Sequence, residues 1–237
     1  MPQAAIEGFE NRHRLNVVHA WGMTELSPLG TISRLKPHLD GAPAAERFRV
    51  RASQGVQAPL VELRAMTEAG LAPADGRTMG ELEVRGPWVA SGYLNQPAGP
   101  DKFTADGWFR TGDVVTIDPE GYVRIADRTK DLIKSGGEWI SSIDLENIAV
   151  AHPAIAEAAV IGVKHPKWDE RPIIVAVKKP GQEVSKEDLL RFYEGKIAKW
   201  WMPDDVVFVK ELPHTATGKL SKLTLRQQMK DYKLGAG

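Results

Sequence analysis

The stretch Asp127-Arg128-Thr129-Lys130-Asp131-Leu132-Ile133-Lys134-Ser135-Gly136-Gly137-Glu138-Trp139 places two adjacent glycines within a run of charged residues. Two shorter stretches share this character: Phe109-Arg110-Thr111-Gly112-Asp113 precedes it, and Pro213-His214-Thr215-Ala216-Thr217-Gly218-Lys219 follows it. Glycine lets a backbone approach a ligand closely and adopt positive φ angles. Carboxylates accept hydrogen bonds from hydroxyls, and cations bind phosphates. The three stretches together indicate a nucleotide site.

Composition excludes several other classes of function. The chain has 237 residues and is 42% hydrophobic, enough for one or two domains with proper cores. Lys plus Arg and Asp plus Glu both number 31, so no net field attracts nucleic acid or an anionic membrane. There is no cysteine, the six histidines lack metal-ligand spacing, and no apolar run approaches the roughly 18 residues of a membrane span. We therefore expect a cytoplasmic protein with no nucleic-acid partner, no membrane span and no zinc site.

A fourth motif, Trp21-Gly22-Met23-Thr24-Glu25, lies upstream of the other three. In content, order and spacing the set resembles the later motifs of the adenylate-forming (AMP-binding) superfamily. The likeness is greatest to bacterial medium- and long-chain fatty-acyl-CoA synthetases, around residues 134–141, 166–168 and 170–172. The resemblance implies an AMP-forming ligase that converts a carboxylate and ATP to acyl-adenylate and pyrophosphate, and then adenylate and CoA to acyl-CoA and AMP. It also implies ATP/AMP, Mg²⁺ and coenzyme A as cofactors or substrates.

The resemblance assigns roles to residues in the first half of the chain. Trp21 would stack on adenine, where the family more often has tyrosine, and Thr24 would contact a phosphate oxygen. Glu25 would bind the magnesium ion, a hard cation that prefers oxygen ligands. Asp113 would accept hydrogen bonds from both ribose hydroxyls, and Arg128 would contact the ribose or the phosphates.

Further assignments fall in the second half. Lys219 would bridge the attacking carboxylate and the α-phosphate, where charge builds up. The Gly136–Gly137 pair would line the pantetheine tunnel, and Lys134 and Trp139 would contact the nucleotide in a closed state. Lys130 would be the hinge about which the small domain rotates.

Other interpretations remain open. Taken alone, the Trp21–Glu25, Phe109–Asp113 and Gly136–Gly137 segments are each more typical of ordinary turns than of a site. Within the ligase class, an aryl acid or a short thioether acid is an alternative to a fatty acid. A non-catalytic nucleotide-binding or interaction module on the same fold is the alternative from another class, and loss of at least one charged motif residue would be expected of it.

The pattern predicts an α+β chain in two parts. Residues 1–127 are interpreted as the C-terminal part of a large domain, a partial sheet plus a β-barrel subdomain. Residues 128–130 form a hinge, and residues 131–237 form a small mobile α+β domain. The family's phosphate loop has no counterpart here, so we expect the chain to be part of a longer enzyme and inactive alone.

In the first part we expect a helix over 3–15, with Ala5, Ile6, Phe9 and Leu15 toward a core, and a strand over 15–20. Partners for their apolar faces would lie before Met1, and a homo-oligomer is another way to cover them. Alternation over 80–85 predicts a strand with Leu82 and Val84 inward and Glu83 outward. A hairpin of 114–117 with 122–125 should follow.

In the second part the expected elements are regular. Helices are predicted over 141–151, from Ser185 through a stripe of Leu189, Tyr193, Ile197 and Trp200, and over about 221–232. Short apolar runs over 158–163, 173–177 and 206–209 predict buried strands.

Overall fold

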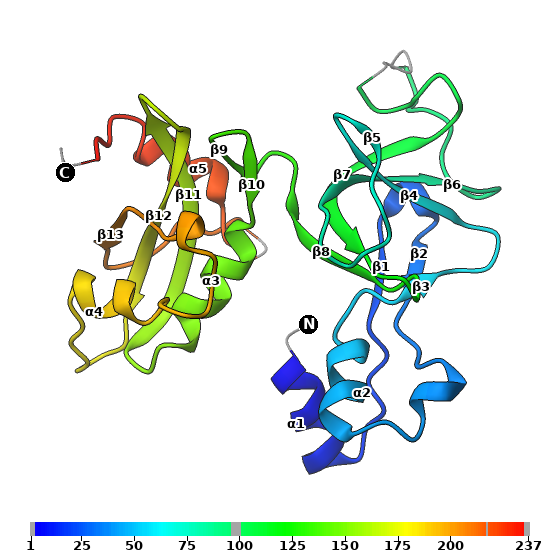
Figure 1. The fold of residues 1–237 in the computed structure, drawn as a ribbon, viewed down its shortest axis with the longest axis horizontal. Helices are drawn as coiled ribbons and strands as arrows, with labels where there is room; N and C mark the ends of the chain where they lie inside the picture. The colour runs from blue at the N-terminus through cyan, green and yellow to red at the C-terminus, as the bar shows by residue number, and fades with distance from the viewer. Residues whose placement is uncertain (1–2, 96–100, 217, 235–237) are drawn as a thin grey trace. The chain divides into compact units, whose positions relative to one another are not determined.

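A computed structural model describes residues 3–95, 101–216 and 218–234 (Figure 1). The chain divides into two compact units, residues 1–129 and residues 130–237, and each is described by itself. Lys130, the predicted pivot, is the exposed first residue of the second unit. Its hinge role stays a prediction.

The first unit is mostly antiparallel sheet. Its helices are α1 (Gln3–His13) and α2 (Ala44–Arg51), with two 3-10 turns, η1 (Thr24–Leu26) and η2 (Pro37–Leu39). Its strands are β1 (Ala20–Gly22), β2 (Leu29–Ile32), β3 (Val56–Gln57), β4 (Glu62–Thr67), β5 (Gly70–Leu71), β6 (Gly80–Arg85), β7 (Phe109–Ile117) and β8 (Val123–Arg128). They form a sheet in the order β1-β2-β3 and a second in the order β5-β4-β6-β7-β8.

The second of these sheets carries the larger core of the unit. Leu82 and Val84 of β6 are fully buried, and the predicted hairpin is confirmed as the antiparallel pair β7–β8. The expected outward position of Glu83 is wrong, because its carboxylate is buried against Arg64, whose Nε lies 2.6 Å away, and near Arg110. Two cations replace the water that this charge would otherwise need.

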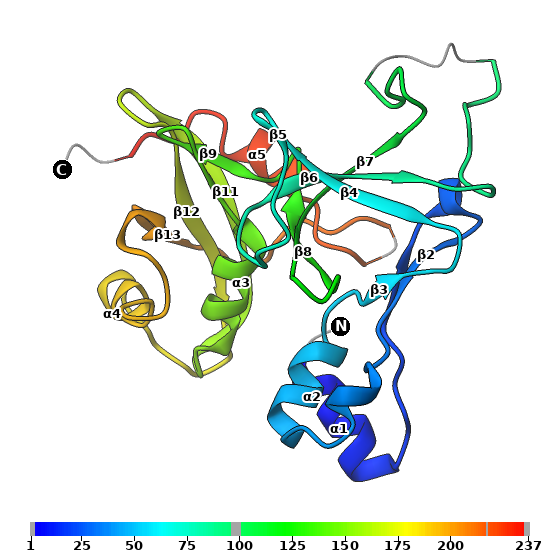
Figure 2. The ribbon, with the colours of Figure 1, turned by 45° about the vertical axis from the view of Figure 1, so that its right-hand side comes forward.

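The N-terminal segment differs from expectation. The helix is confirmed as α1, which lies beside α2 (Figure 2). Ile6 is buried as expected, whereas Phe9 and Leu15 are exposed. The strand predicted over 15–20 is wrong, since regular pairing begins at Ala20. The Arg51 guanidinium instead donates to the Asn16 side chain and to the Val17 carbonyl, so side-chain bonds occupy groups that a strand would pair.

The second unit is one five-stranded sheet with helices on both faces. Its helices are α3 (Ser142–Ala151), α4 (Lys186–Arg191) and α5 (Lys222–Gln228), with the 3-10 turn η3 (Lys199–Trp201). Its strands are β9 (Ile133–Ser135), β10 (Glu138–Ile140), β11 (Ile155–His165), β12 (Asp169–Lys178) and β13 (Asp205–Phe208). The order is β10-β9-β12-β11, and β13 pairs in parallel with β12.

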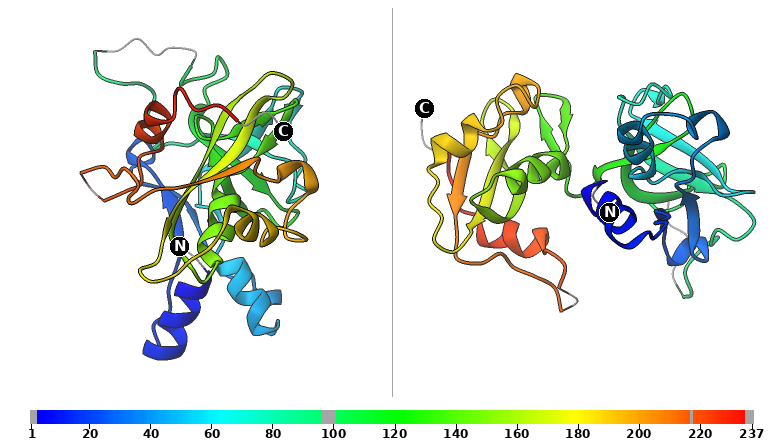
Figure 3. Two further views of the ribbon diagram at one scale, coloured as in Figure 1. Left: turned by 90° about the vertical axis from the view of Figure 1, so that its left-hand side faces the viewer. Right: turned by 90° about the horizontal axis from the view of Figure 1, so that it is seen from below.

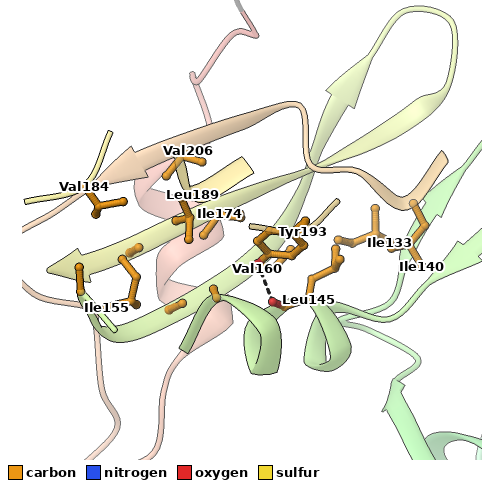
Figure 4. Close-up of a cluster of buried hydrophobic side chains, with 14 residues drawn as sticks. Ile133, Ile140, Leu145, Ile155, Val160, Ile174, Val184, Leu189, Tyr193 and Val206 are labelled. Carbon is orange, nitrogen blue, oxygen red and sulfur yellow. Dashed lines mark hydrogen bonds between the residues drawn. The ribbon is translucent and has the colours of Figure 1, made fainter. Parts of the chain in front are cut away.

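Alternate residues of β11 and β12 enter two cores. On one face Val160 and Ile174 pack with the fully buried Leu145 of α3, Leu189 of α4 and Tyr193, which follows α4 (Figure 4). The other face packs against α5, which lies across the sheet from α3 (Figure 3). Both cores consist of residues from this unit alone.

Helix lengths in this unit depart from the predicted ranges. The helix after Ser185 ends at Arg191, so Tyr193, Ile197 and Trp200 are not on it and the predicted helical stripe is wrong beyond Leu189. Gly195 adopts a φ of +73° just beyond, a conformation incompatible with a continuing helix. The last helix is likewise shorter than 221–232, because it ends at Gln228. The helix over 141–151 and the three apolar strands are confirmed.

The predicted α+β class and the order of its parts are confirmed. The strands of the expected barrel subdomain form the sheet β5-β4-β6-β7-β8, with β5 and β8 at its edges. Across the described residues, no helix is long and apolar enough to cross a membrane.

Candidate functional site

Three of the predicted nucleotide-binding residues meet in the first unit. The Trp21 indole Nε1 donates a hydrogen bond of 2.8 Å to Asp113 Oδ2, and Arg128 Nε lies 3.5 Å from Asp113 Oδ1. Trp21 comes from β1, Asp113 from β7, and Arg128 is its register partner on β8. Sheet pairing joins Asp113 to Arg128, and a side-chain hydrogen bond joins Trp21 of the other sheet to Asp113, although the sequence separates these residues by up to 107 positions, from 21 to 128.

Two glycines make room for this arrangement. A Cβ on Gly30 would lie 2.4 Å from the Trp21 ring, and a Cβ on Gly22 would lie 1.8 Å from the Pro28 carbonyl oxygen. Both distances are impossible for real side chains. Gly30 lets the Trp21 ring pack closely against the backbone, which leaves Trp21 only 9% exposed, and Gly22 lets the Pro28 backbone approach β1.

Burial sets the electrostatics of Asp113. Desolvation raises the pKa of its carboxyl, and the indole hydrogen bond and Arg128 both act in the opposite direction. The net result is a carboxylate whose charge is expensive to keep in this environment. A costly, solvent-reaching acceptor of this kind is typical of a ligand site.

Glu25 lies in η1 with its position fixed by two contacts. Its backbone carbonyl accepts from Ala90 N at 2.7 Å, and its carboxylate accepts from the Tyr93 hydroxyl at 2.6 Å. The Glu25 bond raises the pKa of Tyr93 to about 12, so this phenol remains a donor at neutral pH. Thr24, the preceding residue, is exposed.

The Glu25 carboxylate suits a magnesium ion that is bound mainly through a substrate. Mg²⁺ commonly takes one or two protein carboxylates and completes its shell with water and substrate phosphates. No cluster of three or more His, Cys, Asp or Glu side chains that could hold a metal exists within the described ranges 3–95, 101–216 and 218–234. The half-exposed Glu25 carboxylate therefore fits a Mg²⁺ ion whose other ligands are water and substrate phosphates, and not an ion held by protein ligands alone.

Lys219 lies in the second unit on an exposed loop. Thr215 N donates to the Lys219 carbonyl at 2.7 Å, and Gly218 N donates to the Thr215 carbonyl at 2.9 Å, so the loop is a tight turn rather than a free strand. Thr217 of the motif lies outside the described residues. The ammonium is thus carried at an exposed turn whose backbone is held by local bonds.

The Gly136–Gly137 pair forms the two-residue turn of the β9–β10 hairpin, with φ angles of +60° and +87°. Positive φ at both positions is the signature of a type I′ turn. Lys134 and Trp139 face each other across this hairpin. The structure thus brings these four residues together in one element.

A cavity that the sequence did not predict opens beside this turn. It has a volume of about 560 Å³ and is lined by Gly136, the exposed Trp168 and Trp200, and the anchored Arg171. The Arg171 guanidinium donates to Asp204, Ser135 and two backbone carbonyls. These bonds hold the side chain in place as part of the cavity lining. Trp200 is predicted from the sequence to lie on a helical stripe, and that prediction hides its place in the cavity wall. Tyr93 was also missed.

Comparison with known proteins identifies the family of the chain. The model for the AMP-binding enzyme family matches residues 1–94, and the model for the AMP-binding enzyme C-terminal domain matches residues 144–219. The chain belongs to the AMP-binding enzymes.

Its curated relatives are CoA ligases. The chain is 52% identical to the 3-methylmercaptopropionyl-CoA ligase of Ruegeria pomeroyi, over 99% of this chain and 43% of that protein. It is 46% identical to a medium-chain-fatty-acid–CoA ligase of Ectopseudomonas oleovorans, over 98% of this chain and 42% of that protein. The chain thus spans less than half the length of these relatives.

Solved structures agree with the sequence comparison. ATP-bound MatB from Rhodopseudomonas palustris matches with a TM-score of 0.81 and 34% identity, over 98% of this chain and 44% of that one. The o-succinylbenzoate CoA synthetase of Bacillus subtilis, in complex with an acyl-adenylate, matches with a TM-score of 0.79 and 30% identity, over 100% of this chain and 45% of that one. The adenylate-forming fold is therefore shown.

Proposed function

We propose that this chain serves an ATP-dependent, AMP-forming acyl-CoA ligase of the cytoplasm. The observation that carries the proposal is the convergence of Trp21, Asp113 and Arg128 in one unit of an AMP-binding enzyme. A buried carboxylate flanked by an indole donor and a guanidinium suits a ribose, whose two hydroxyls need an acceptor. Relatives that are 52% and 46% identical to this chain are named as CoA ligases.

The residues divide the work of two half-reactions. In the first, Asp113 and Arg128 hold the nucleotide, Thr24 contacts a phosphate oxygen, and Lys219 stabilises charge as the carboxylate attacks the α-phosphate. Glu25 would hold Mg²⁺, which neutralises phosphate charge when bound. Tyr93, at 2.6 Å, fixes the carboxylate that would do so.

The second half-reaction admits the CoA thiol. Gly136–Gly137 offers a backbone without side chains for the pantetheine arm, and Lys134 and Trp139 on the same hairpin would contact the nucleotide. The neighbouring cavity is lined by Trp168 and Trp200, and aromatic rings of this kind suit contact with an aromatic base. A change of backbone conformation at Lys130 would separate the two steps.

Two classes of acid compete. The motif around Gly136 favours a medium- or long-chain fatty acid. The 52% identity to a 3-methylmercaptopropionyl-CoA ligase favours a short thioether acid, and is the higher of the two identities. Both are flexible unbranched acids, which distinguishes them from the aryl acids that we rank lower.

A pyrophosphate-release assay tests the proposal on the complete protein in which this chain occurs. It would use ATP, Mg²⁺ and a series of acids from acetate to palmitate, with 3-methylmercaptopropionate and benzoate, each with and without CoA. We expect pyrophosphate release with either a fatty acid or the short thioether acid. Acyl-CoA should form only when CoA is present. Nucleotide binding without pyrophosphate release for any acid would favour a non-catalytic module.

A further inference from the structure

We propose that two cations of helix α5, Lys222 and Arg226, hold the turn of residues 213–221 so that it presents Lys219 correctly for adenylate formation. They are positioning residues, because they act on the reaction only through Lys219. The inference rests on the proposed function for the role of Lys219, but every contact that it uses lies within the second unit.

The turn that carries Lys219 is attached directly to α5. Ser221 N donates to the Pro213 carbonyl at 2.8 Å, so the two ends of the turn meet. Ser221 is also the N-cap of α5, and Lys222 is the first residue of the helix, three positions after Lys219. A shift of α5 therefore moves Lys219 with it.

Helix α5 has little apolar surface with which to fix itself. It has seven residues, of which Leu225 is buried, whereas Leu223 is 66% exposed. Isolated helices shorter than about 12 residues are marginal in water, so contacts with the rest of the unit must hold a helix of this length. Polar contacts thus carry much of the attachment of α5.

Two ion pairs one helical turn apart supply that attachment. Lys222 Nζ lies 2.7 Å from Glu146 Oε1 of α3, and the Arg226 guanidinium donates to Asp131 Oδ1 at 2.8 Å. All four side chains are largely buried, with none more than 29% exposed. Positions four apart lie on one face of a helix, so both cations reach the same side of α5. Asp131 directly follows Lys130, the predicted pivot.

The pair on α3 is part of a larger network. Glu146 Oε1 also accepts from Val160 N of β11 at 2.8 Å, and Lys222 Nζ donates to the Ser142 hydroxyl at 2.5 Å. These bonds join α5 to a helix and to a central strand of the unit. The start of α5, next to the turn, is thereby fixed to the sheet.

Buried ion pairs of this kind fix geometry more than they stabilise. Apolar side chains of similar volume are often as stable at such sites, or more so. An ion pair, in contrast, demands one geometry, because breaking it leaves a buried charge without a partner. Such pairs at the base of the turn suit a lysine that must meet its substrate to within about 1 Å.

Replacements on α5 test the two pairs. Lys222→Met and Arg226→Met remove the cations and keep long side chains. Lys222→Met with Glu146→Gln is the safeguard against misfolding, because it leaves no buried charge unpaired and glutamine can still accept the β11 amide. Lys178→Met is the matched control, because its ammonium also pairs with a carboxylate of this unit, 2.8 Å away on Glu183, but lies outside α5.

Half-reaction assays on the complete protein separate positioning from a general loss of structure. We expect Lys222→Met and Arg226→Met each to lower adenylate formation by about tenfold or more. Synthetic acyl-adenylate with CoA should react within about twofold of the normal rate, since Lys219 acts in the first half-reaction only. Lys178→Met should be normal in both assays.

A Lys219→Ala background gives the sharper comparison. Lys222→Met or Arg226→Met should cost nothing further there, because the side chain that they position is gone. Unchanged adenylate formation in the single variants, equal loss in both half-reactions, or a further loss in the Lys219→Ala background would each overturn the proposal.

Hydrogen exchange followed by mass spectrometry measures the attachment of α5 without any substrate. Amides of residues 221–228 in the complete protein should exchange about tenfold faster in both single variants and in the double variant, and at the normal rate in Lys178→Met. Unchanged exchange in α5 would overturn the inference even if activity falls. Faster exchange, in a protein whose wild type releases no pyrophosphate with any acid, would refute the proposed function while supporting the attachment.

Discussion

The Asp113 side chain is largely buried, and burial disfavours the charged form that ribose binding requires. Its pKa is raised by desolvation despite the indole bond and Arg128, so the ionised carboxylate costs the first unit stability at neutral pH. Function explains why the cost is kept, because sites often hold groups that folding alone would not select. The cost of the Asp113 charge to stability can be measured on the chain itself.

Asp113→Asn should therefore stabilise the first unit at pH 7 while weakening nucleotide binding. Asparagine keeps an oxygen that can accept from Trp21 but removes the buried charge. A gain of about 1 kcal/mol, near 2–4 °C in the melting temperature, is the usual size for one such change. Because the folded pKa lies above the unfolded value, the advantage should shrink as pH falls toward about 4. Thermal unfolding at pH 7 and pH 4 checks both parts, and a destabilised variant at pH 7 would contradict the account.

Lys219→Ala should impair one half-reaction only. Its charge acts where negative charge builds at the α-phosphate, which is gone once the adenylate exists. We expect adenylate formation by the complete protein to fall by roughly 10²-fold or more. Synthetic acyl-adenylate with CoA should react at nearly the normal rate, so equal loss in both assays would refute this role.

Prediction from sequence at this scale had a clear limit. The resemblance assigned Trp21, Asp113 and Arg128 to one nucleotide, and the structure places the three side chains next to one another, while their roles stay predictions. The direct bond between Trp21 and Asp113 spans 92 positions and depends on the depth to which Gly30 lets the ring sink. Tyr93 gave no local signal, since its partner Glu25 is 68 positions away.

At the scale of elements, the β9–β10 turn shows two constraints acting on one residue. Gly136 and Gly137 have the positive φ angles of a type I′ turn, which Asn-Gly satisfies as readily as Gly-Gly. A Cβ on Gly136, however, would lie 2.8 Å from the Trp168 ring. Turn chemistry alone thus predicts a tolerance that packing removes.

Gly136→Asn should therefore destabilise the second unit by about 1–3 kcal/mol, the usual cost of overpacking. The matched control is Gly137→Asn, where nothing lies within 4 Å of a Cβ and only backbone strain applies. Adding Trp168→Ala should remove most of the Gly136→Asn penalty in a double-mutant cycle. Urea unfolding measures each free energy, and additive losses would show that the contact is not the cause.

Helix lengths were the least predictable feature at this scale. The periodic stripe after Ser185 continues through Trp200, yet α4 ends at Arg191, because Gly195 turns the chain. Apolar spacing indicates which residues seek a core but not the fold of the segment between them. Buried strands were easier to predict, because the sequences of β11, β12 and β13 contain continuous apolar runs.

At the scale of the whole molecule, the link at Lys130 is a prediction about backbone freedom. Lys130→Pro would fix φ near −65° and block a rotation there, whereas Lys130→Ala removes only a charge. We expect thioester formation by the complete protein to suffer most in the proline variant, with adenylation less affected and the alanine variant mild. Normal acyl-CoA formation by Lys130→Pro would place the pivot elsewhere.

The second unit should fold without the first. Both of its cores draw only on residues from position 130 onward, and helices cover both faces of its sheet, so no apolar face depends on the preceding unit. Residues 130–237 expressed alone should unfold cooperatively in urea with dispersed amide NMR signals. Within it, Tyr193→Phe should cost about 1 kcal/mol, because the buried hydroxyl donates to the Leu145 carbonyl at 2.6 Å and that acceptor would lose its partner. Collapsed amide signals from the isolated unit would show that its stability requires residues 1–129, and that the two cores are not the independent bodies their composition indicates.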